Sequence, residues 1–439
     1  MRYLLLVLVF LSIQPAGMAQ DEVPDYVSAP RPENRNRVYD DDIHTVQLVR
    51  NNGYLNDPII RLGRRETLSL LFDDFSMEVR DINYRIIHCD ANWETSDVDF
   101  WEYADGMEEG YDNQYEFSRA MNQRYIHYRI TFPNEEMQIK ASGNYIIQVY
   151  RDGDPTKMMI TRRFMVVEDR VRLQVNVGKA FDPALRFQKQ EVDVIIDHPG
   201  YPIYNPSQDV HLVILQNQRW DNAITDLKPI FIEADRLRYD YEEENTFFAG
   251  NEYRFFDIRN FNLRSENVEG SIKRPDTIHI FMDKVKPRIQ HTVINSRQNI
   301  FGNQIIGQTE HEAGSHLDAD YAMVYFYLLQ DYPTPNTDYY IFGGLSDYEH
   351  GDRYKMRYNE VKKRYERPLY LKQGFYNWLF HSVKKGGDKV GDLRPVEGSF
   401  SETKNEYTVL VYHRRPGDEF DRLVGLKTVI FPVDVIKKD

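Results

Sequence analysis

The chain has 439 residues, a formal net charge of −14 and a single cysteine, Cys89. The acidic balance excludes nucleic acid as the expected partner, because a phosphate backbone binds basic surfaces. One cysteine excludes an internal disulfide and any metal site built from several thiolates. The length predicts about two to four domains. The 31 tyrosines, 24 phenylalanines and 4 tryptophans favour strands and contact surfaces, so we expect an all-β protein.

The N-terminus has the pattern of an export signal. A basic second residue precedes the apolar run Tyr3–Ile13, which is too short to span a bilayer. Small residues at Gly17 and Ala19 predict cleavage after Ala19, so residues 1–19 are interpreted as a signal peptide. No later apolar run is long enough for a membrane helix, so we expect an exported protein that is not membrane-spanning itself. Residues 20–42, rich in Pro, Asn, Arg and Asp, are predicted to be a flexible N-terminal segment.

Residues 43–168 are predicted to form an N-terminal β-sandwich. Polar and apolar side chains alternate along Tyr125–Phe132, as is typical of a strand with one buried face. A turn at Arg151–Asp154 separates the strand-like runs Asn144–Tyr150 and Ile160–Val167. Because the turn is only a few residues long, these two runs predict a hairpin.

Two further β-domains are expected after residue 168. Val171–Val177 alternates with period two and opens a middle β-domain, which with its connector is predicted over residues 169–318. Residues 319–439 are predicted to form a C-terminal immunoglobulin-like β-sandwich, with strands that include Met323–Leu329 and Tyr407–Tyr412. Strands about every eight to twelve residues are typical of sandwiches. The expected fold class is therefore all-β, with tandem immunoglobulin-like, early-set β-sandwich domains.

Several short motifs suggest chemistry but lack the required pattern. Glu310–His316 holds two histidines five apart, whereas the zinc-protease motif needs them four apart. Ser96–Trp101 begins like a calcium loop, but a tryptophan stands where an oxygen ligand is required. Lys384–Lys389 is glycine-rich and basic without phosphate-loop spacing, and a Gly-x-Ser-x-Gly elbow is absent from the sequence. We therefore predict no catalytic residues, no cofactor and no metal, and we interpret the protein as not an enzyme.

One segment is a candidate contact surface. Residues 90–112 contain nine acidic side chains and no Lys or Arg, together with five aromatic side chains. Aromatic anchors surrounded by one sign of charge are typical of protein-contact surfaces. An alternative interpretation is an irregular connection whose aromatics cap their own sandwich. The candidate partner contacts are Trp93, Asp97, Asp99, Phe100, Trp101, Tyr103 and Tyr111.

Several sequence blocks are long and unusual. They include Tyr54–Gly63, Ile86–Trp93 and Thr161–Glu168 in the first half of the chain, and Leu371–Asn377 and Glu406–Tyr412 in the second. In this order they resemble the type IX secretion system plug protein family. The resemblance implies a non-enzymatic periplasmic protein of Bacteroidetes-type bacteria, associated with the inner face of the outer membrane. Its implied partner is the outer-membrane translocon barrel, whose periplasmic opening such a plug closes when no substrate is engaged.

A second resemblance leaves another function open. Asp338–Tyr348, followed by Gln373–Tyr376, is similar to the β-sandwich of glycogen- and starch-binding modules. Those modules carry an Asn-Trp pair whose indole stacks on a sugar ring, and Asp347 and Tyr348 stand in its place here. The resemblance therefore indicates the sandwich fold of the third domain. A carbohydrate-binding protein of the cell surface or periplasm is the alternative function.

Overall fold

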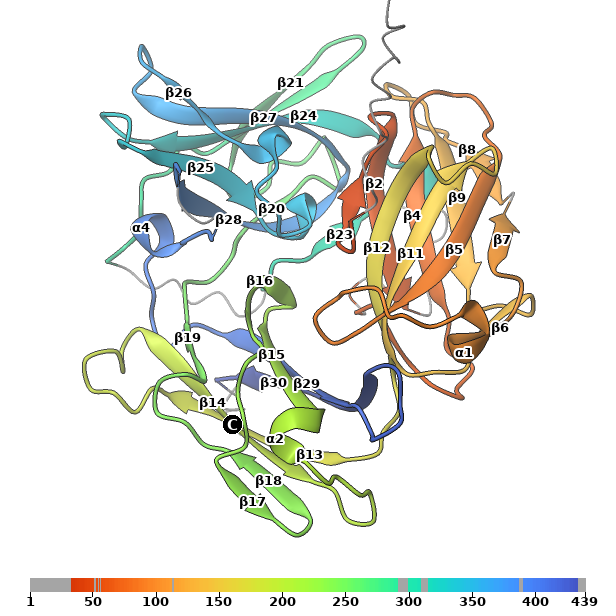
Figure 1. Cartoon of the computed structure of the whole chain (residues 1–439). Coiled ribbons are helices and arrows are strands. Elements are labelled where there is room, and N and C mark those ends of the chain that lie inside the picture. Colours follow the sequence, from red (N-terminus) through yellow and green to blue (C-terminus); the bar gives the residue numbers. More distant parts are fainter. Residues whose placement is uncertain are drawn as a thin grey trace, which may run out of the picture. The chain divides into compact units, whose positions relative to one another are not determined.

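Alternating β-branched and aromatic residues give a protein whose regular secondary structure consists almost entirely of strands (Figure 1). The structure is a computed structural model that describes residues 33–50, 53, 55, 57–112, 114–290, 299–308, 315–386 and 390–432. The predicted signal peptide 1–19 lies outside the described residues, and so does the first part of the segment predicted over 20–42. The predicted all-β fold class, with β-sandwich domains, is confirmed.

Two sheets form the N-terminal sandwich. The first has the order β1 (Arg37–Val38), β12 (Met158–Val167), β11 (Gly143–Arg151), β5 (Ile82–Cys89) and β7 (Glu109–Asp112), with β3 (Ile59–Arg61) parallel to β12. The second has the order β2 (Ile43–Arg50), β4 (Leu68–Asp74), β9 (Ile126–Phe132) and β8 (Tyr115–Phe117). Large side chains such as Phe72, Tyr145 and Phe164 are fully buried in its core. The predicted hairpin is confirmed, because β11 pairs antiparallel with β12.

The middle sandwich combines distant parts of the chain. One sheet has the order β13 (Arg172–Lys179), β14 (Lys189–Asp197), β18 (Arg236–Tyr239) and β17 (Phe231–Glu233), and β19 (Thr246–Phe248) also pairs with β14. The other has the order β16 (Arg219–Ile224), β15 (Val210–Gln216), β29 (Asn405–His413) and β30 (Arg422–Phe431). Apolar side chains of both sheets share one core.

The C-terminal sandwich takes its strands from residues 254–384. One sheet has β28 (Gly374–Lys384) paired with β20 (Arg254–Asp257), β23 (Gln304–Ile306) and β25 (Thr337–Phe342). The other has the order β21 (Val268–Lys273), β22 (Ile278–Met282), β24 (Tyr321–Leu329), β27 (Arg364–Lys372) and β26 (Arg357–Asn359). Its core is rich in aromatic side chains, including Phe326, Tyr376 and Trp378.

Strand pairing crosses the domain limit expected at residues 318/319. The middle domain predicted over residues 169–318 would include Ile278–Met282, but this strand, β22, pairs in parallel with β24 of the C-terminal sandwich. It grouped Tyr407–Tyr412 with the third domain, but β29 pairs with β15 of the middle sandwich. The reason is that local patterning identifies a strand but not its partner, which is chosen by the complementary faces of distant segments. The domain limits themselves remain a prediction.

The other elements are short. β6 (Ala104–Gly106) and β10 (Met137–Ile139) form a two-stranded sheet. The helical turns are α1 (Phe100–Tyr103), α2 (Pro206–Asp209), α3 (Ser315–Asp318), α4 (Arg394–Glu397), η1 (Gly344–Ser346) and η2 (Asp352–Tyr354). Within the described part of the chain, these helices are too short to cross a membrane. Within the segment predicted to be flexible, β1 pairs antiparallel with β12.

The three sandwiches pack on one another through buried side chains. Ile146 and Met165, on the outer face of the first N-terminal sheet, meet Val213 and Tyr412 of the middle sandwich. The hydroxyl of Tyr412 also donates a hydrogen bond to Asn144 Oδ1 at 2.7 Å. Residues 33–439 form one compact unit, so contacts between the sandwiches belong to the folded core.

Candidate functional site

Three of the seven predicted contact residues lie inside the fold. Phe100 and Tyr103, on α1, are 6% exposed and belong to the core of the N-terminal sandwich. The Tyr103 hydroxyl donates to the carbonyl oxygen of Ile86 at 3.2 Å, and burial raises the pKa of Tyr103 to about 12. These two rings pack residues 90–112 against the N-terminal sandwich. This is the arrangement described by the alternative interpretation, in which the aromatics of the segment cap their own sandwich.

Trp93 is also buried, at the interface between the N-terminal and middle sandwiches. Its ring packs edge-on against Trp220 of β16, with ring centroids 5.1 Å apart. The guanidinium of Arg163 lies 4.2 Å from the centre of the Trp93 ring, a distance at which a cation and an aromatic face attract each other. The position of Trp93 follows from the turn at Asp90–Glu94, in which the Trp93 N–H donates to the carbonyl of Asp90 at 2.9 Å.

The other four predicted contact residues are exposed. Asp97 and Asp99 lie on the loop before α1. Trp101 is 61% exposed, and Tyr111 on β7 is 52% exposed. The structure therefore divides the predicted group into residues that position the segment and residues that can meet a partner without unfolding.

The exposed surface continues beyond the segment predicted from sequence. Tyr115 and Phe117 on β8, with Met107 and Met121 on neighbouring loops, are also exposed. We call these four residues, together with Asp97, Asp99, Trp101 and Tyr111, the acidic-aromatic edge. Figure 1 shows α1, β6, β7 and β8 along the same side of the N-terminal sandwich. The alternating order Tyr115-Glu116-Phe117, which precedes the next basic residue, Arg119, is the sequence signal for this extension.

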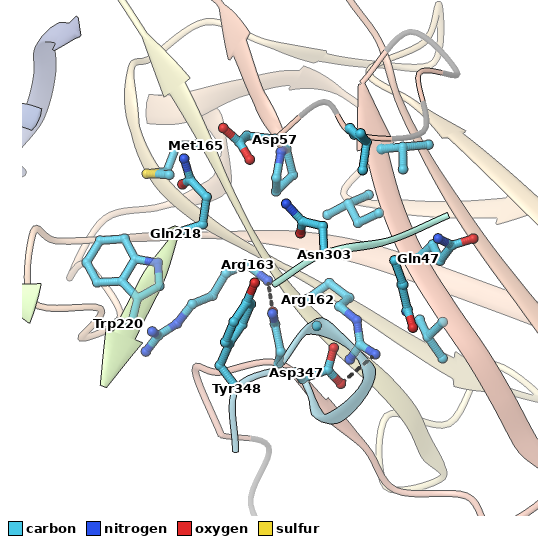
Figure 2. Close-up of a pocket in the computed structure, with 18 of the residues that line it drawn as sticks. Gln47, Asp57, Arg162, Arg163, Met165, Gln218, Trp220, Asn303, Asp347 and Tyr348 are labelled. Atoms are coloured by element: carbon cyan, nitrogen blue, oxygen red, sulfur yellow. Dashed lines mark hydrogen bonds and ion pairs between the residues drawn. The ribbon is translucent and has the colours of Figure 1, made fainter. Parts of the chain in front are cut away.

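A cavity of about 190 Å³, lined by both polar and apolar side chains, lies where the three sandwiches meet (Figure 2). Arg162 of β12 pairs with Asp347 at 3.1 Å across this cavity. Figure 2 shows Arg163 extending along Trp220. Asp57 also lines the cavity, and burial raises the pKa of its carboxyl group to about 7. Amide side chains, including Gln47, Gln218 and Asn303, complete much of the lining. The cavity can hold polar groups or water, and its charged residues join the sandwiches.

Tyr348, the residue at the place of a sugar-stacking indole, lines the same cavity. It is half-buried. Its hydroxyl donates to the carbonyl oxygen of Phe301 at 3.1 Å, and its ring packs edge-on against Phe342. A sugar platform needs an open ring face, so this position does not add support to carbohydrate binding.

The motifs that suggested metal chemistry find no support in the described structure. Within the described residues, no group of three or more His, Cys, Asp or Glu side chains is arranged to hold a metal ion. Of the motif at 310–316, residues 310–314 lie outside the described residues, and the His316 ring stacks on His127 with centroids 5.6 Å apart. Residues 387–389 of the glycine-rich basic motif also lie outside them.

Cys89 is expected to be unreactive in the folded protein. Its side chain is fully buried, and burial raises the pKa of the thiol to about 12. Because the thiolate is the reactive form, a maleimide at mildly alkaline pH should leave the folded chain unlabelled and should label it in urea. Mass spectrometry of both samples checks this prediction. Rapid labelling of the folded protein would contradict it.

Comparison with known proteins identifies the family. Residues 43–168 match the model of the type 9 secretion system plug protein 1st domain. A crystal structure of a hypothetical protein from Parabacteroides merdae is 31% identical, with a TM-score of 0.86, and the alignment covers 90% of this chain and 99% of that one. The chain belongs to the type IX secretion system plug protein family. The family predicted from the sequence blocks is confirmed.

Other comparisons add nothing to this assignment. Trypsin-activated alpha-2-macroglobulin from Escherichia coli aligns with a TM-score of 0.16 and 8% identity, over 89% of this chain and 29% of that one, which carries no argument about fold. No curated protein matches the chain. Membership of the plug family, with an all-β fold, points to a non-enzymatic role in type IX secretion. The acidic-aromatic edge lies within the residues that match the plug family's first domain.

Proposed function

We propose that this plug-family protein binds the outer-membrane translocon barrel of the type IX secretion system and closes its periplasmic opening when no substrate is engaged. The observation that carries the proposal is the match of residues 43–168 to the first domain of the family. The chain would act in the periplasm, at the inner face of the outer membrane, after removal of residues 1–19. A channel wide enough for folded proteins leaks small solutes when open, and a folded body at its mouth blocks that leak by shape.

The physical demands on such a plug are rigidity and reversible binding. Buried ion pairs between sandwiches, such as Asp73 with Lys372 at 2.6 Å, support a body that keeps its shape. A contact that must be released favours moderate affinity and a polar rim around a few aromatic anchors. The acidic-aromatic edge meets this description, since Trp101 and Tyr111 are exposed among acidic side chains.

Replacing both Trp101 and Tyr111 with alanine is expected to reduce recovery of the translocon about tenfold. Exposed Trp and Tyr side chains supply much of the binding energy at protein contacts, and neither ring belongs to a buried cluster among the described residues. The measurement is purification of a tagged chain in mild detergent, followed by mass spectrometry of its partners.

A matched control is Tyr332→Ala, because Tyr332 is 78% exposed on the C-terminal sandwich. Undiminished recovery by the folded double variant would exclude the acidic-aromatic edge as the contact. Failure of the unmodified chain to recover any outer-membrane barrel would overturn the proposed function. Closure has its own readout: cells without the protein should admit a dye that normally does not cross the outer membrane.

A further inference from the structure

Strand β2 is an open edge of the second N-terminal sheet, and it borders the cavity between the sandwiches. Among the described strands it pairs only with β4. The N–H of Phe75 donates to the carbonyl of Asp42 at 2.9 Å, so every second residue along β4, Leu71 among them, bonds to β2. Leu71 is the partner of Gln47. The next residue of β2, Leu48, therefore directs its backbone N–H and C=O away from the sheet, and it lines the cavity.

Strand β23 of the C-terminal sandwich is a second open edge at the same cavity. Among the described strands it pairs only with β28. The N–H of Asn377 donates to the carbonyl of Asn303 at 3.1 Å. By the same alternation, Ile305 directs its backbone groups to β28 and Gln304 directs its own groups away. Gln304 lines the cavity, so edges from two sandwiches present backbone groups to one space.

Side-chain groups in the lining are also without partners. Within the described residues, the amides of Gln47, Asn303 and Gln304 form no hydrogen bond, and Figure 2 shows Gln47 and Asn303 in the lining. All three are half-buried, so solvent reaches them. The indole N–H of Trp93 is buried in the lining and has no acceptor in the described part of the chain. Native proteins leave few buried polar groups unpaired, so a ligand with both donors and acceptors would satisfy this lining.

One cation in the lining lacks a counter-charge. The Nε of Arg163 donates to the carbonyl of Asn34 at 2.8 Å, and no carboxylate of the described residues lies within ion-pair distance of this guanidinium. The nearby Glu349 is paired with another arginine, and Asp347 is paired with Arg162. Burial lowers the pKa of Arg163 to about 10, which is the direction expected of a cation that its surroundings do not neutralise.

The chemistry of the lining favours a peptide over a sugar. A sugar needs an open aromatic face, but Arg163 covers one face of Trp93, and Trp220 packs edge-on against that ring. Open strand edges suit an extended backbone, whose N–H and C=O groups alternate in the same way. Asp57, the other acidic residue of the lining beside Asp347, has a pKa of about 7. At neutral pH it is partly uncharged, so it opposes a ligand carboxylate only weakly.

We propose that this cavity binds the end of a short extended peptide that carries a free C-terminal carboxylate. The peptide backbone hydrogen-bonds to the open edges at Leu48 of β2 and Gln304 of β23, as in other cases of strand addition. The amides of Gln47 and Asn303 bond peptide groups that the edges leave free. The carboxylate pairs with the guanidinium of Arg163 and supplies its missing counter-charge. The cavity shares no residue with the acidic-aromatic edge, so the inference goes beyond the proposed plug function and does not depend on it.

The test uses the unmodified mature chain and synthetic pentapeptides of mixed sequence. The chain and the pool are mixed and separated by ultrafiltration, and mass spectrometry identifies the peptides retained with the protein. Peptides with a free carboxylate should be retained at least about tenfold more than the same pool made as C-terminal amides, because amidation removes a charge-assisted pair. For the peptide retained best, methylation of its backbone amides should weaken binding about tenfold in calorimetry.

Hydrogen exchange and three variants locate the peptide. The backbone amides of Leu48 and Gln304 should exchange with solvent about tenfold more slowly when it is bound. Gln47→Trp fills the cavity with a larger side chain and should abolish binding. Gln138→Trp, at an exposed position of β10, is the matched control and should bind as the unmodified chain does. Arg163→Gln removes the cation, so it should bind the free and amidated peptides equally. Thermal unfolding checks that each variant folds.

The outcomes decide the inference without reference to the translocon. Equal retention of the free and amidated pools by the unmodified chain would overturn the carboxylate site. Failure to retain any peptide would overturn it too, and so would binding that Gln47→Trp leaves unchanged, because the peptide would then lie elsewhere. Carboxylate-dependent retention with protection of Leu48 and Gln304 would support it. Recovery of the translocon reports on the plug function separately, since Gln47→Trp leaves the acidic-aromatic edge intact.

Discussion

Replacing Lys372 with methionine is expected to lower the free energy of unfolding by about 3–5 kcal/mol. The ammonium of Lys372 on β27 contacts Asp73 Oδ2 on β4 at 2.6 Å, and both side chains are at most 1% exposed. The same carboxylate accepts hydrogen bonds from Tyr321 and pairs with His127, each at 2.6 Å. Without the ammonium, a buried carboxylate between two sandwiches loses its main counter-charge. Urea unfolding followed by tryptophan fluorescence measures the loss.

Lys385→Met is the matched control for this prediction. Lys385 is 56% exposed and reaches Asp338 at 3.5 Å, so its removal should be close to neutral. The double variant Asp73→Leu/Lys372→Met should regain part of the lost stability, because it removes both buried charges. An unfolding free energy of Lys372→Met equal to that of the unmodified chain would show that the pair does not bind the sandwiches together.

The pH dependence of the free energy of unfolding should also reveal the ion pair between Asp73 and Lys372. Burial by itself would raise the pKa of Asp73, but Lys372 and His127 outweigh it and hold the pKa at about 2, below the usual 3.8. Because the folded pKa is the lower one, this contribution is complete above the usual value and is lost as the pH falls towards 2. In Lys372→Met, stability should decline at higher pH than in the unmodified chain.

Glu397→Gln is expected to cost a similar amount, about 3–5 kcal/mol, in the C-terminal sandwich. Glu397 of α4 is fully buried between Arg254 and Arg288, whose Nε atoms lie 3.1 and 2.6 Å from its oxygens. Its Oε1 also accepts the backbone N–H of Phe380 at 3.0 Å. Glutamine preserves the volume but removes the charge, so two largely buried guanidinium groups are left without their common carboxylate.

The exposed pair of Glu269 with Lys284 provides the control, since Glu269→Gln should leave unfolding within experimental error. Burial would raise the pKa of Glu397, but the two arginines bring it down to about 2. Stability from this group is therefore present above the ordinary glutamate pKa and is lost as the pH falls through the folded value. A Glu397→Gln protein with unchanged unfolding and unchanged acid sensitivity would contradict this account.

Much of the local structure could be predicted because its signals are local. The alternation in Tyr125–Phe132 became β9, and the turn at Arg151–Asp154 joined β11 to β12. Unusual sequence blocks were sufficient to predict the plug family. The acidic-aromatic composition also located the segment in which exposed Trp101 and Tyr111 are found.

Composition could not divide that segment into its two parts. Trp93 and Trp101 are both tryptophans among acidic residues, yet Trp93 is 5% exposed and Trp101 is 61% exposed. The difference arises because Trp220 and Arg163, far away in sequence, cover one ring and not the other. Whether an aromatic side chain is buried depends on the residues that fold over it. Those residues are far away in the sequence, so the residues next to the side chain do not reveal its burial.

The sequence by itself determined the strands, the all-β class and the family, because side-chain alternation, turn residues and unusual sequence blocks are each contained in short stretches of the chain. Only the tertiary structure decided which strands far apart in the sequence pair, as when β15 joins β29. It also decided which charges are neutralised, as when Asp73 meets Lys372 almost 300 residues later. These choices depend on the fit of surfaces that folding brings together, and each such contact must outweigh the entropy lost in closing the intervening chain.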